Sequence, residues 1–171
     1  MAGGFVGVDP GKAGHLCRLP EDGGPPEFWA LPTVPAGKGR AYDLRGVYRL
    51  VLDICALARF SLLEQQQAMR GQGVTSTFST GYGFGLLEMA LTASSGPFDT
   101  IRPAEWKKRL GLTGPKGEPK KAKKARAVAK AQRLYPAAEL VPPGCRVPSH
   151  DRAEALLLAH YAKALATGAP L

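Results

Sequence analysis

Four acidic residues of this chain stand where their carboxylates could together hold a metal ion. Asp9 and Glu64 each end a short apolar stretch that predicts a buried strand. Asp151 and Glu154 lie three residues apart near the start of the last predicted helix, so they share one face of it. Each acid also has an ordinary explanation: Asp9 can cap a turn, Glu64 can end a strand, and Asp151 can complement the helix dipole. Together, the four form a specific pattern.

Carboxylates that converge on a sheet edge repel one another unless cations lie between them. Oxygen ligands of this kind suit Mg²⁺ or Mn²⁺ rather than Zn²⁺. Two such ions about 4 Å apart can activate a water and stabilise the leaving oxygen when a phosphodiester is cut. His150 adjoins the acidic pair and could bind metal, move a proton, or simply lie exposed where the helix begins. The acids therefore predict a site for two divalent cations.

The elements that would position these acids follow from the spacing of apolar residues and of turn residues. We expect a hairpin over 4–19, strands at 27–31, 60–64 and 98–101, and loops at 32–40 and 70–83. We expect helices at 41–58, 84–94, 103–110 and 120–134, and a final helix from an N-cap at Ser149 to about Ala166. Strands followed by alternating helices and strands indicate an α/β fold, with a mixed five-stranded sheet flanked by helices in a single domain over residues 1–171.

The positive charge of the chain is concentrated in one segment. The 171 residues carry a formal net charge of +9. Residues 102–133, the basic segment, contain 12 Lys or Arg against 2 Glu, whereas the rest of the chain contains 11 against 12. A block of like charge can be an ordinary solvated face, but it more often serves an interaction. The segment therefore predicts a polyanionic partner such as nucleic acid.

The cysteines and the N-terminal residues indicate the cellular compartment of the protein. Cys17, Cys55 and Cys145 are far apart and lack the spacing of a metal site, so we expect reduced thiols of an intracellular protein. Asp9 and Pro10 interrupt the first apolar stretch, which argues against a signal peptide. No apolar run approaches the length of a membrane span. These features predict a cytoplasmic protein.

Three motifs, in this order and at this chain length, resemble those of the RuvC-type Holliday junction resolvases, the phage-encoded members in particular. They are Gly7-Val8-Asp9-Pro10-Gly11, Leu63-Glu64-Gln65 and His150-Asp151-Arg152-Ala153-Glu154-Ala155-Leu156. The resemblance implies a ribonuclease H-like fold, a homodimer, and paired nicks in a four-way DNA junction made with divalent cations. By position, Asp9 would bridge two metals, Glu64 and Glu154 would be further ligands, and Asp151 or His150 would complete the set.

The resemblance also implies which residues meet DNA. Lysines of the basic segment would lie close to the cut phosphate, and the candidates are Lys107, Lys108, Lys120, Lys121 and Lys124. Arg70 and Gln67 follow Glu64 and could contact the sugar-phosphate backbone near the crossover. Two departures stand out: Gln67 occupies the place of an aromatic residue found in cellular members, and Glu154 replaces the more usual Asp.

Other functions compete with this one. A different ribonuclease H-like nuclease, such as a transposase core, or a DNA-binding module without catalysis would share the fold. The first motif also resembles the phosphate loop of actin-like and sugar-kinase-like ATP-binding proteins, but these need two such domains. Residues 81–85 lack the lysine of a P-loop and predict close helix packing, which could lie across a dimer interface. Trp29 and Trp106 are expected in the core rather than in base stacking.

Overall fold

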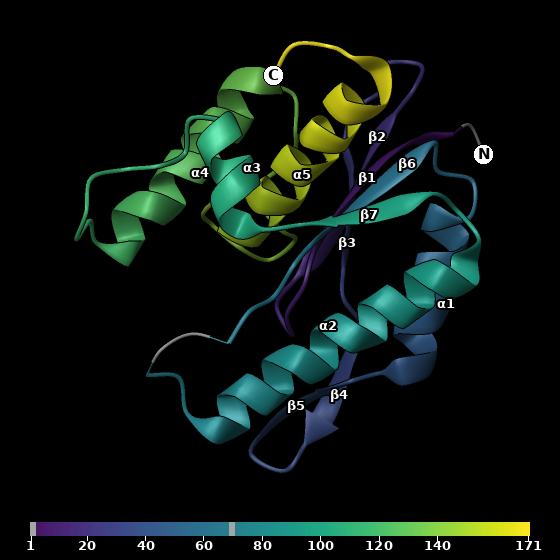
Figure 1. Cartoon of the computed structure of the whole chain (residues 1–171), viewed down its shortest axis with the longest axis vertical. Coiled ribbons are helices and arrows are strands. Elements are labelled where there is room, and N and C mark those ends of the chain that lie inside the picture. The colour runs from purple at the N-terminus through teal and green to yellow at the C-terminus, as the bar shows by residue number, and fades with distance from the viewer. Residues whose placement is uncertain (1–2, 69–70) are drawn as a thin grey trace.

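A computed structural model describes residues 3–68 and 71–171 and has one mixed sheet between two layers of helices (Figure 1). The sheet has five strands in the order β3-β2-β1-β6-β7. Its strands are β1 Gly4–Asp9, β2 His15–Pro20, β3 Glu27–Ala30, β6 Phe60–Glu64 and β7 Phe98–Ile101. β1 pairs antiparallel with β2 and parallel with β6, and β6 pairs parallel with β7. The predicted α/β fold with a mixed five-stranded sheet is confirmed.

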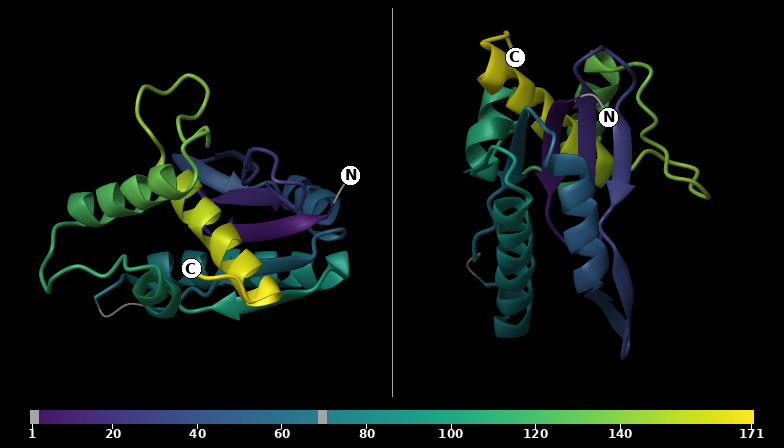
Figure 2. Two further views of the ribbon diagram at one scale, coloured as in Figure 1. Left: turned by 90° about the horizontal axis from the view of Figure 1, so that it is seen from above. Right: turned by 90° about the vertical axis from the view of Figure 1, so that its right-hand side faces the viewer.

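Helices cover both faces of the sheet. α1 Leu44–Cys55 and α2 Val74–Ser94 lie on one face, and α3 Pro103–Arg109, α4 Lys120–Leu134 and α5 His150–Thr167 lie on the other (Figures 1 and 2). Ser149 caps α5 as predicted, because its hydroxyl accepts a hydrogen bond from the backbone N–H of Arg152. Asp43 caps α1 in the same way through Gly46, so that helix is shorter at both ends than the predicted 41–58.

The alternation of side chains along the central strands decides where the acids point. Val8 in β1 and Leu63 in β6 belong to the core under α1 and α2, whereas Leu62 belongs to the core under α5. Successive side chains of a strand face opposite sides of the sheet. Asp9 and Glu64 therefore both face α5. Because β1 and β6 are parallel and pair Val8 with Leu63, the two acids emerge side by side at the carboxyl edge.

The backbone of α5 lies very close to that of β1 at Gly7. A Cβ atom built at Gly7 would overlap the carbonyl oxygen of Ala155 and the backbone nitrogen of Ala159. Only glycine leaves room for this contact. The contact sets α5 across the sheet (Figure 2) and brings its first turns, with Glu154, over the end of β1.

The prediction of a loop over 70–83 was wrong, because α2 begins at Val74. Its Gly, Ser and Thr residues have low helix propensity, but packing against the rest of the fold outweighs that preference. Gly83 illustrates the packing: a Cβ atom there would overlap the hydroxyl of Tyr42, so glycine lets the helix lie directly against that ring. Leu87 and Leu91 of the same helix are fully buried.

The prediction of a loop over 32–40 was also wrong in part. Strands β4 Thr33–Ala36 and β5 Gly39–Tyr42 form a separate two-stranded antiparallel hairpin. The side chain of Arg40 ties its strands together, donating from Nε to the hydroxyl of Thr33 at 2.6 Å and from Nη2 to the Thr33 carbonyl at 2.7 Å. A side-chain contact of this kind has no local sequence signature.

The remaining expectations concern cysteines and membranes. Cys17, Cys55 and Cys145 are all free, the first two buried and the third exposed. Within residues 3–68 and 71–171, none of the helices has the length and apolar character needed to cross a membrane.

Candidate metal and nucleic-acid site

Three of the four predicted acids meet at the carboxyl edge of the sheet. The carboxylates of Asp9, Glu64 and Glu154, called here the carboxylate cluster, each offer an oxygen within 4.8 Å of the other two. They come from the end of β1, the end of β6 and the first turns of α5. Asp9 is 7% exposed and Glu64 is 5% exposed. Residues far apart in the sequence thus form one compact, largely buried acidic site.

The electrostatics of the carboxylate cluster favour a cation. Burial raises the pKa of Asp9 well above its ordinary value, and the nearby charges of Glu64, Glu154 and Asp151 raise it further, while Lys107 lowers it. Burial and an adjacent carboxylate both disfavour a charged acid. A divalent cation relieves both effects at once, because it supplies opposite charge to the ionised oxygens.

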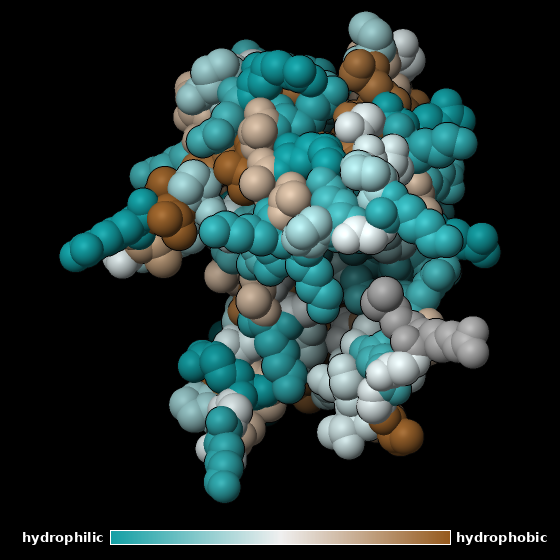
Figure 3. All heavy atoms as spheres, turned by 90° about the vertical axis from the view of Figure 1, so that its left-hand side faces the viewer, coloured by the Kyte–Doolittle hydropathy of each residue, from teal (hydrophilic) through white to brown (hydrophobic). Residues whose placement is uncertain are grey.

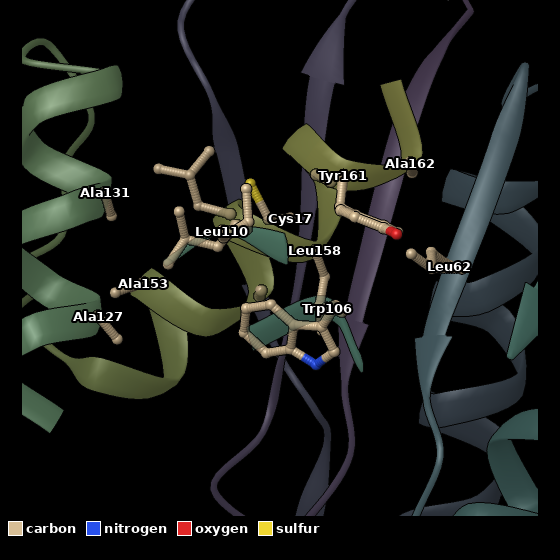
Figure 4. Packing of buried hydrophobic residues seen from close by; sticks show 14 of the residues in the cluster. Cys17, Leu62, Trp106, Leu110, Ala127, Ala131, Ala153, Leu158, Tyr161 and Ala162 are labelled. Carbon is tan, nitrogen blue, oxygen red and sulfur yellow. The ribbon is translucent and has the colours of Figure 1, made fainter. Parts of the chain in front are cut away.

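Glu64 is held in place by hydrogen bonds from two side chains. Trp106 donates from its indole Nε1 to Oε2 of Glu64 at 2.8 Å, and Gln66 donates from Nε2 to Oε1 at 3.4 Å. Burial raises the pKa of Glu64, Lys107 counters that effect, and Glu154 adds to it. Trp106 is fully buried, and Figure 4 shows its ring beside Leu158 with the nitrogen directed away from the apolar cluster. The prediction that Trp106 belongs to the core is confirmed, but its hydrogen bond to a candidate ligand has no sequence signal.

Lys107 lies inside the acidic site rather than on an open DNA-binding face. Its Nζ is 2.9 Å from Oε1 of Glu154 and 3.7 Å from Oε2 of Glu64. Burial by itself lowers the pKa of Lys107, but Glu64, Glu154 and Asp9 outweigh it and the pKa is raised. One ammonium among three carboxylates still leaves the ionised cluster negatively charged. Lys107 therefore compensates part of the repulsion between the carboxylates, and the remaining negative charge favours a cation.

The two candidates for the remaining ligand lie together at the rim of the site. Nε2 of His150 is 3.0 Å from Oδ1 of Asp151, and both side chains are partly exposed. Asp151 is close enough to raise the pKa of Asp9. Within the described part of the chain, the carboxylate cluster is the group whose ligand atoms already converge, and it does not include this pair.

The donor set and its spacing fit divalent metal. Ligands of one Mg²⁺ lie at about 2.0–2.1 Å from it, so two of them are at most about 4.2 Å apart. Oxygens within 4.8 Å of one another reach that spacing with small side-chain shifts, and they also suit a pair of ions about 4 Å apart. All three groups are hard oxygen ligands, which Mg²⁺ and Mn²⁺ prefer over Zn²⁺.

A hollow beside the carboxylate cluster opens onto the basic segment. It has a volume of about 300 Å³, and Lys107, Lys123, Thr113 and Glu154 are among the residues that line it. Figure 3, which views the molecule from the side where the parallel strands end, shows a hollowed, mostly hydrophilic face there. Lys123 belongs to the basic segment expected to follow the DNA backbone, but it was not among the lysines predicted to lie close to the cut phosphate. It lies one helical turn before the buried Ala127, but the many alanines of α4 hide that periodicity in the sequence.

The other predicted DNA contacts lie outside this hollow. Four of these predicted contacts are lysines with exposed side chains on α3 and α4: Lys108, Lys120, Lys121 and Lys124. Gln67 is exposed beyond the end of β6, whereas its neighbour Gln66 contacts Glu64. Arg70 lies outside the described residues. Of the predicted lysines, Lys107 is the one that contacts the acids.

Solved structures with this architecture are known. The structure of T. thermophilus RuvC in complex with Holliday junction substrate superposes with a TM-score of 0.53 and 18% sequence identity, covering 96% of this chain and 96% of that one. The Thermus thermophilus RuvC structure gives a TM-score of 0.51 and 17% identity over 90% of this chain and 89% of that one. No protein-family model and no curated protein sequence matches the chain. The likeness is one of fold, and it shows that this chain has the ribonuclease H-like fold of the RuvC structures.

Proposed function

We propose that this protein is a metal-dependent endonuclease that resolves four-way DNA junctions by paired nicks. The observation that carries the proposal is the carboxylate cluster, buried at the edge of a RuvC-like sheet and open to a hollow lined by Lys107 and Lys123. A similar fold has been solved as RuvC with a Holliday junction substrate. The nuclease domain spans residues 1–171 and acts in the cytoplasm, that of a bacterial host if the chain is phage-encoded.

Asp9, Glu64 and Glu154 would hold the divalent cations, which are Mg²⁺ or Mn²⁺. When bound, two such ions activate a water for attack and stabilise the oxygen that leaves. Trp106 keeps the Glu64 carboxylate turned toward the site through its hydrogen bond. Asp151 or His150, which contact each other at the rim of the site, would supply the remaining ligand.

The basic segment would bind the DNA backbone. Phosphate contacts by Lys and Arg provide most of the affinity of nucleic-acid-binding proteins. Lys107 and Lys123 both line the hollow that Glu154 also lines. The long, flexible stem of Lys107 would let its ammonium, which contacts Glu154 and Glu64, also reach a phosphate bound in the hollow.

The outer face of α2 would bind a second copy of the chain. Four exposed apolar residues follow one stripe of the helix: Val74, Phe78, Tyr82 and Met89. Gly81 and Gly85 on the same stripe have open space where a Cβ would stand, so another backbone can come close. A helix that is apolar on both faces is normally buried on both, and the opposite face already packs in the core. A two-fold dimer also matches a substrate that is cut symmetrically.

The decisive experiment compares a four-way junction with linear duplex of the same sequence, each with Mg²⁺, Mn²⁺ or chelator. Paired symmetric nicks confined to the junction, and dependent on metal, are expected. Asp9→Asn should bind the junction without cutting it. Cleavage of linear duplex alone would identify a different ribonuclease H-like nuclease, and junction binding by the wild-type protein without cleavage would identify a module without catalysis.

A further inference from the structure

A histidine lies beside the carboxylate cluster at the same edge of the sheet. β2 begins at His15, which pairs with Asp9 across the antiparallel β1–β2 ladder. Directly opposed residues of such a ladder have their Cβ atoms about 4.5–5.5 Å apart on one face of the sheet. Glu64 is the neighbour of Asp9 on the other side, because β1 lies between β2 and β6. Glu64, Asp9 and His15 therefore form a row across three adjacent strands.

The alternation along β2 turns His15 toward α5. Cys17 and Leu19 belong to the core under α5, whereas Leu16 belongs to the core under α1 and α2. Residues two apart on a strand face the same side of the sheet. His15 therefore faces the same helix as Asp9, and that helix packs on both β1 and β2.

The imidazole of His15 is enclosed near the first turn of α5. The residue is 9% exposed. Burial lowers the pKa of His15 and its bond to the Ala13 backbone raises it, while the charge of Arg152 lowers it and that of Asp151 raises it. Asp151 also raises the pKa of Asp9. The Asp151 carboxylate thus lies within electrostatic reach of both His15 and Asp9.

The hydrogen bond of the His15 ring leaves its other nitrogen available. Nδ1 is 3.0 Å from the carbonyl oxygen of Ala13. A carbonyl oxygen only accepts hydrogen bonds, so Nδ1 carries the hydrogen and Nε2 of the neutral ring keeps its lone pair. Histidines that bind metal through one ring nitrogen usually donate the other N–H to a carbonyl or a carboxylate, which fixes the ring. His15 has this arrangement.

The backbone on both sides of His15 is fixed. His15 pairs with Asp9 in β1 and with Ala30 in β3. The carbonyl of Gly14 accepts a hydrogen bond from the backbone N–H of Leu31 at 2.9 Å. A Cβ atom at Gly14 would overlap the Asp9 carbonyl oxygen, so glycine is needed for the chain to return this close to β1. The position of His15 beside Asp9 is therefore set before any ligand binds.

We propose that His15 is a further ligand of the divalent cations, binding through Nε2 on the side of Asp9 that faces away from Glu64. The proposal rests on the cation binding of the proposed nuclease. Asp9 would lie between a side that offers only carboxylates, from Glu64 and Glu154, and a mixed side, with His15 and Asp151. Transition metals accept imidazole more readily than Mg²⁺, which prefers oxygen. His15 should therefore strengthen the binding of Mn²⁺ more than that of Mg²⁺.

The test uses the full-length protein with Mn²⁺ alone and with its histidines labelled with ¹⁵N. Electron–nuclear double resonance detects histidine nitrogen bound to Mn²⁺ and requires neither DNA nor turnover. The chain has three histidines, His15, His150 and His160, so variants assign the signal. A ¹⁵N coupling is expected in the wild type and in His150→Ala, and it should disappear when His15→Phe is added to His150→Ala. His15→Phe alone should lower Mn²⁺ affinity about 10-fold or more in calorimetric titration.

His160→Gln is the control and should keep the coupling. His160 bonds to Tyr135 and lies ten residues, or about 15 Å, along α5 from His150. His150→Ala leaves His15 in place, so its result does not depend on how well His15→Phe folds. Loss of the coupling in His150→Ala, or bound Mn²⁺ without histidine nitrogen in the wild type, would overturn the proposal. A wild-type protein that binds no Mn²⁺ at all would instead refute the metal-dependent function itself.

Discussion

The indole of Trp106 donates a hydrogen bond from Nε1 to Oε2 of Glu64, 2.8 Å away and 42 residues earlier in the chain. This bond joins the apolar core beneath α5 to the carboxylate cluster. Both residues are buried, so each polar group needs the other as its hydrogen-bond partner. The position of a candidate metal ligand is therefore set by core packing.

Removing this donor should weaken the metal site more than the fold. Trp106→Phe keeps an aromatic ring but leaves Glu64 without its strongest neutral partner, so we expect metal affinity to fall about 10- to 100-fold. The lost hydrogen bond to a charged group should cost about 1.5–3 kcal/mol. Calorimetric titration with Mn²⁺ and denaturant unfolding measure the two effects. Trp29→Phe is the control, and equal Mn²⁺ affinity in both variants would contradict the role given to Trp106.

Gly7 should tolerate no side chain. A methyl group there would overlap Ala155 and Ala159 of α5, so Gly7→Ala must push the helix away from β1. Overpacking of this kind costs about 1–3 kcal/mol, and the displacement of Glu154 should also reduce Mn²⁺ binding. Gly39→Ala, where a Cβ makes only an ordinary contact with Ala36, is the control in both assays. Unchanged unfolding of Gly7→Ala would show that α5 does not depend on this close approach.

The stability of the metal-free protein should fall as pH rises. Burial and neighbouring carboxylates raise the pKa values of Asp9 and Glu64 in the folded state. The unfolded chain, with ordinary values of about 3.9 and 4.3, releases its protons first and is favoured. The contribution of these groups is complete below about pH 4 and is lost as pH rises through the raised values. Lys107 does not alter this window, because its pKa is raised from an already high value.

Thermal unfolding in chelator, measured from about pH 4 upward, shows how steeply stability falls with pH. Added Mn²⁺ should raise the unfolding temperature, and the gain should grow with pH because metal binds ionised carboxylates. In Asp9→Asn, the unfolding temperature in chelator should depend less on pH, and added Mn²⁺ should raise it by less. If Mn²⁺ raised the unfolding temperature equally at every pH, or by as much in Asp9→Asn as in the wild type, cation binding at the carboxylate cluster would be contradicted.

Charge placed on the outer stripe of α2 should prevent dimerisation. Phe78 is 75% exposed in the single chain and stacks on Tyr82 with 6.5 Å between the ring centroids. Phe78→Glu should give a monomer in sedimentation equilibrium, because burying an unpaired charge in an interface is strongly unfavourable. Leu57→Glu changes an equally apolar exposed residue outside α2 and should leave the dimer intact. A wild-type protein that stays monomeric at high concentration would rule out this interface.

Lys123 should act as a phosphate contact. Lys123→Ala is expected to weaken junction binding for all sequences alike and to reduce the salt slope of the logarithm of affinity by about 1. Charge reversal at all four lysines of the first turns of α4, Lys120, Lys121, Lys123 and Lys124, should have a larger effect of the same kind. Arg49→Ala removes an exposed cation from α1, on the opposite face of the sheet. Affinities that respond equally to Lys123→Ala and Arg49→Ala would make the basic segment an ordinary surface.

Local pattern in the sequence determined the central strands, the acids that end them and the basic segment. The two-residue alternation in β1 and β6 follows from the strand geometry itself, so that Asp9 and Glu64 could be predicted on a shared edge. The helical spacing of Asp151 and Glu154 placed both on one face in the same way. These features depend on neighbours a few residues apart, and such neighbours are visible in a sequence.

The tertiary structure alone decided which acids converge, and it brought Lys107 to Glu154 across 47 residues of chain. It also extended α2 into a stretch of Gly, Ser and Thr and ordered the β4–β5 hairpin. The physical reason is common to all of these: they arise from contacts between distant segments, whose packing free energy outweighs the weak local preferences that a sequence displays.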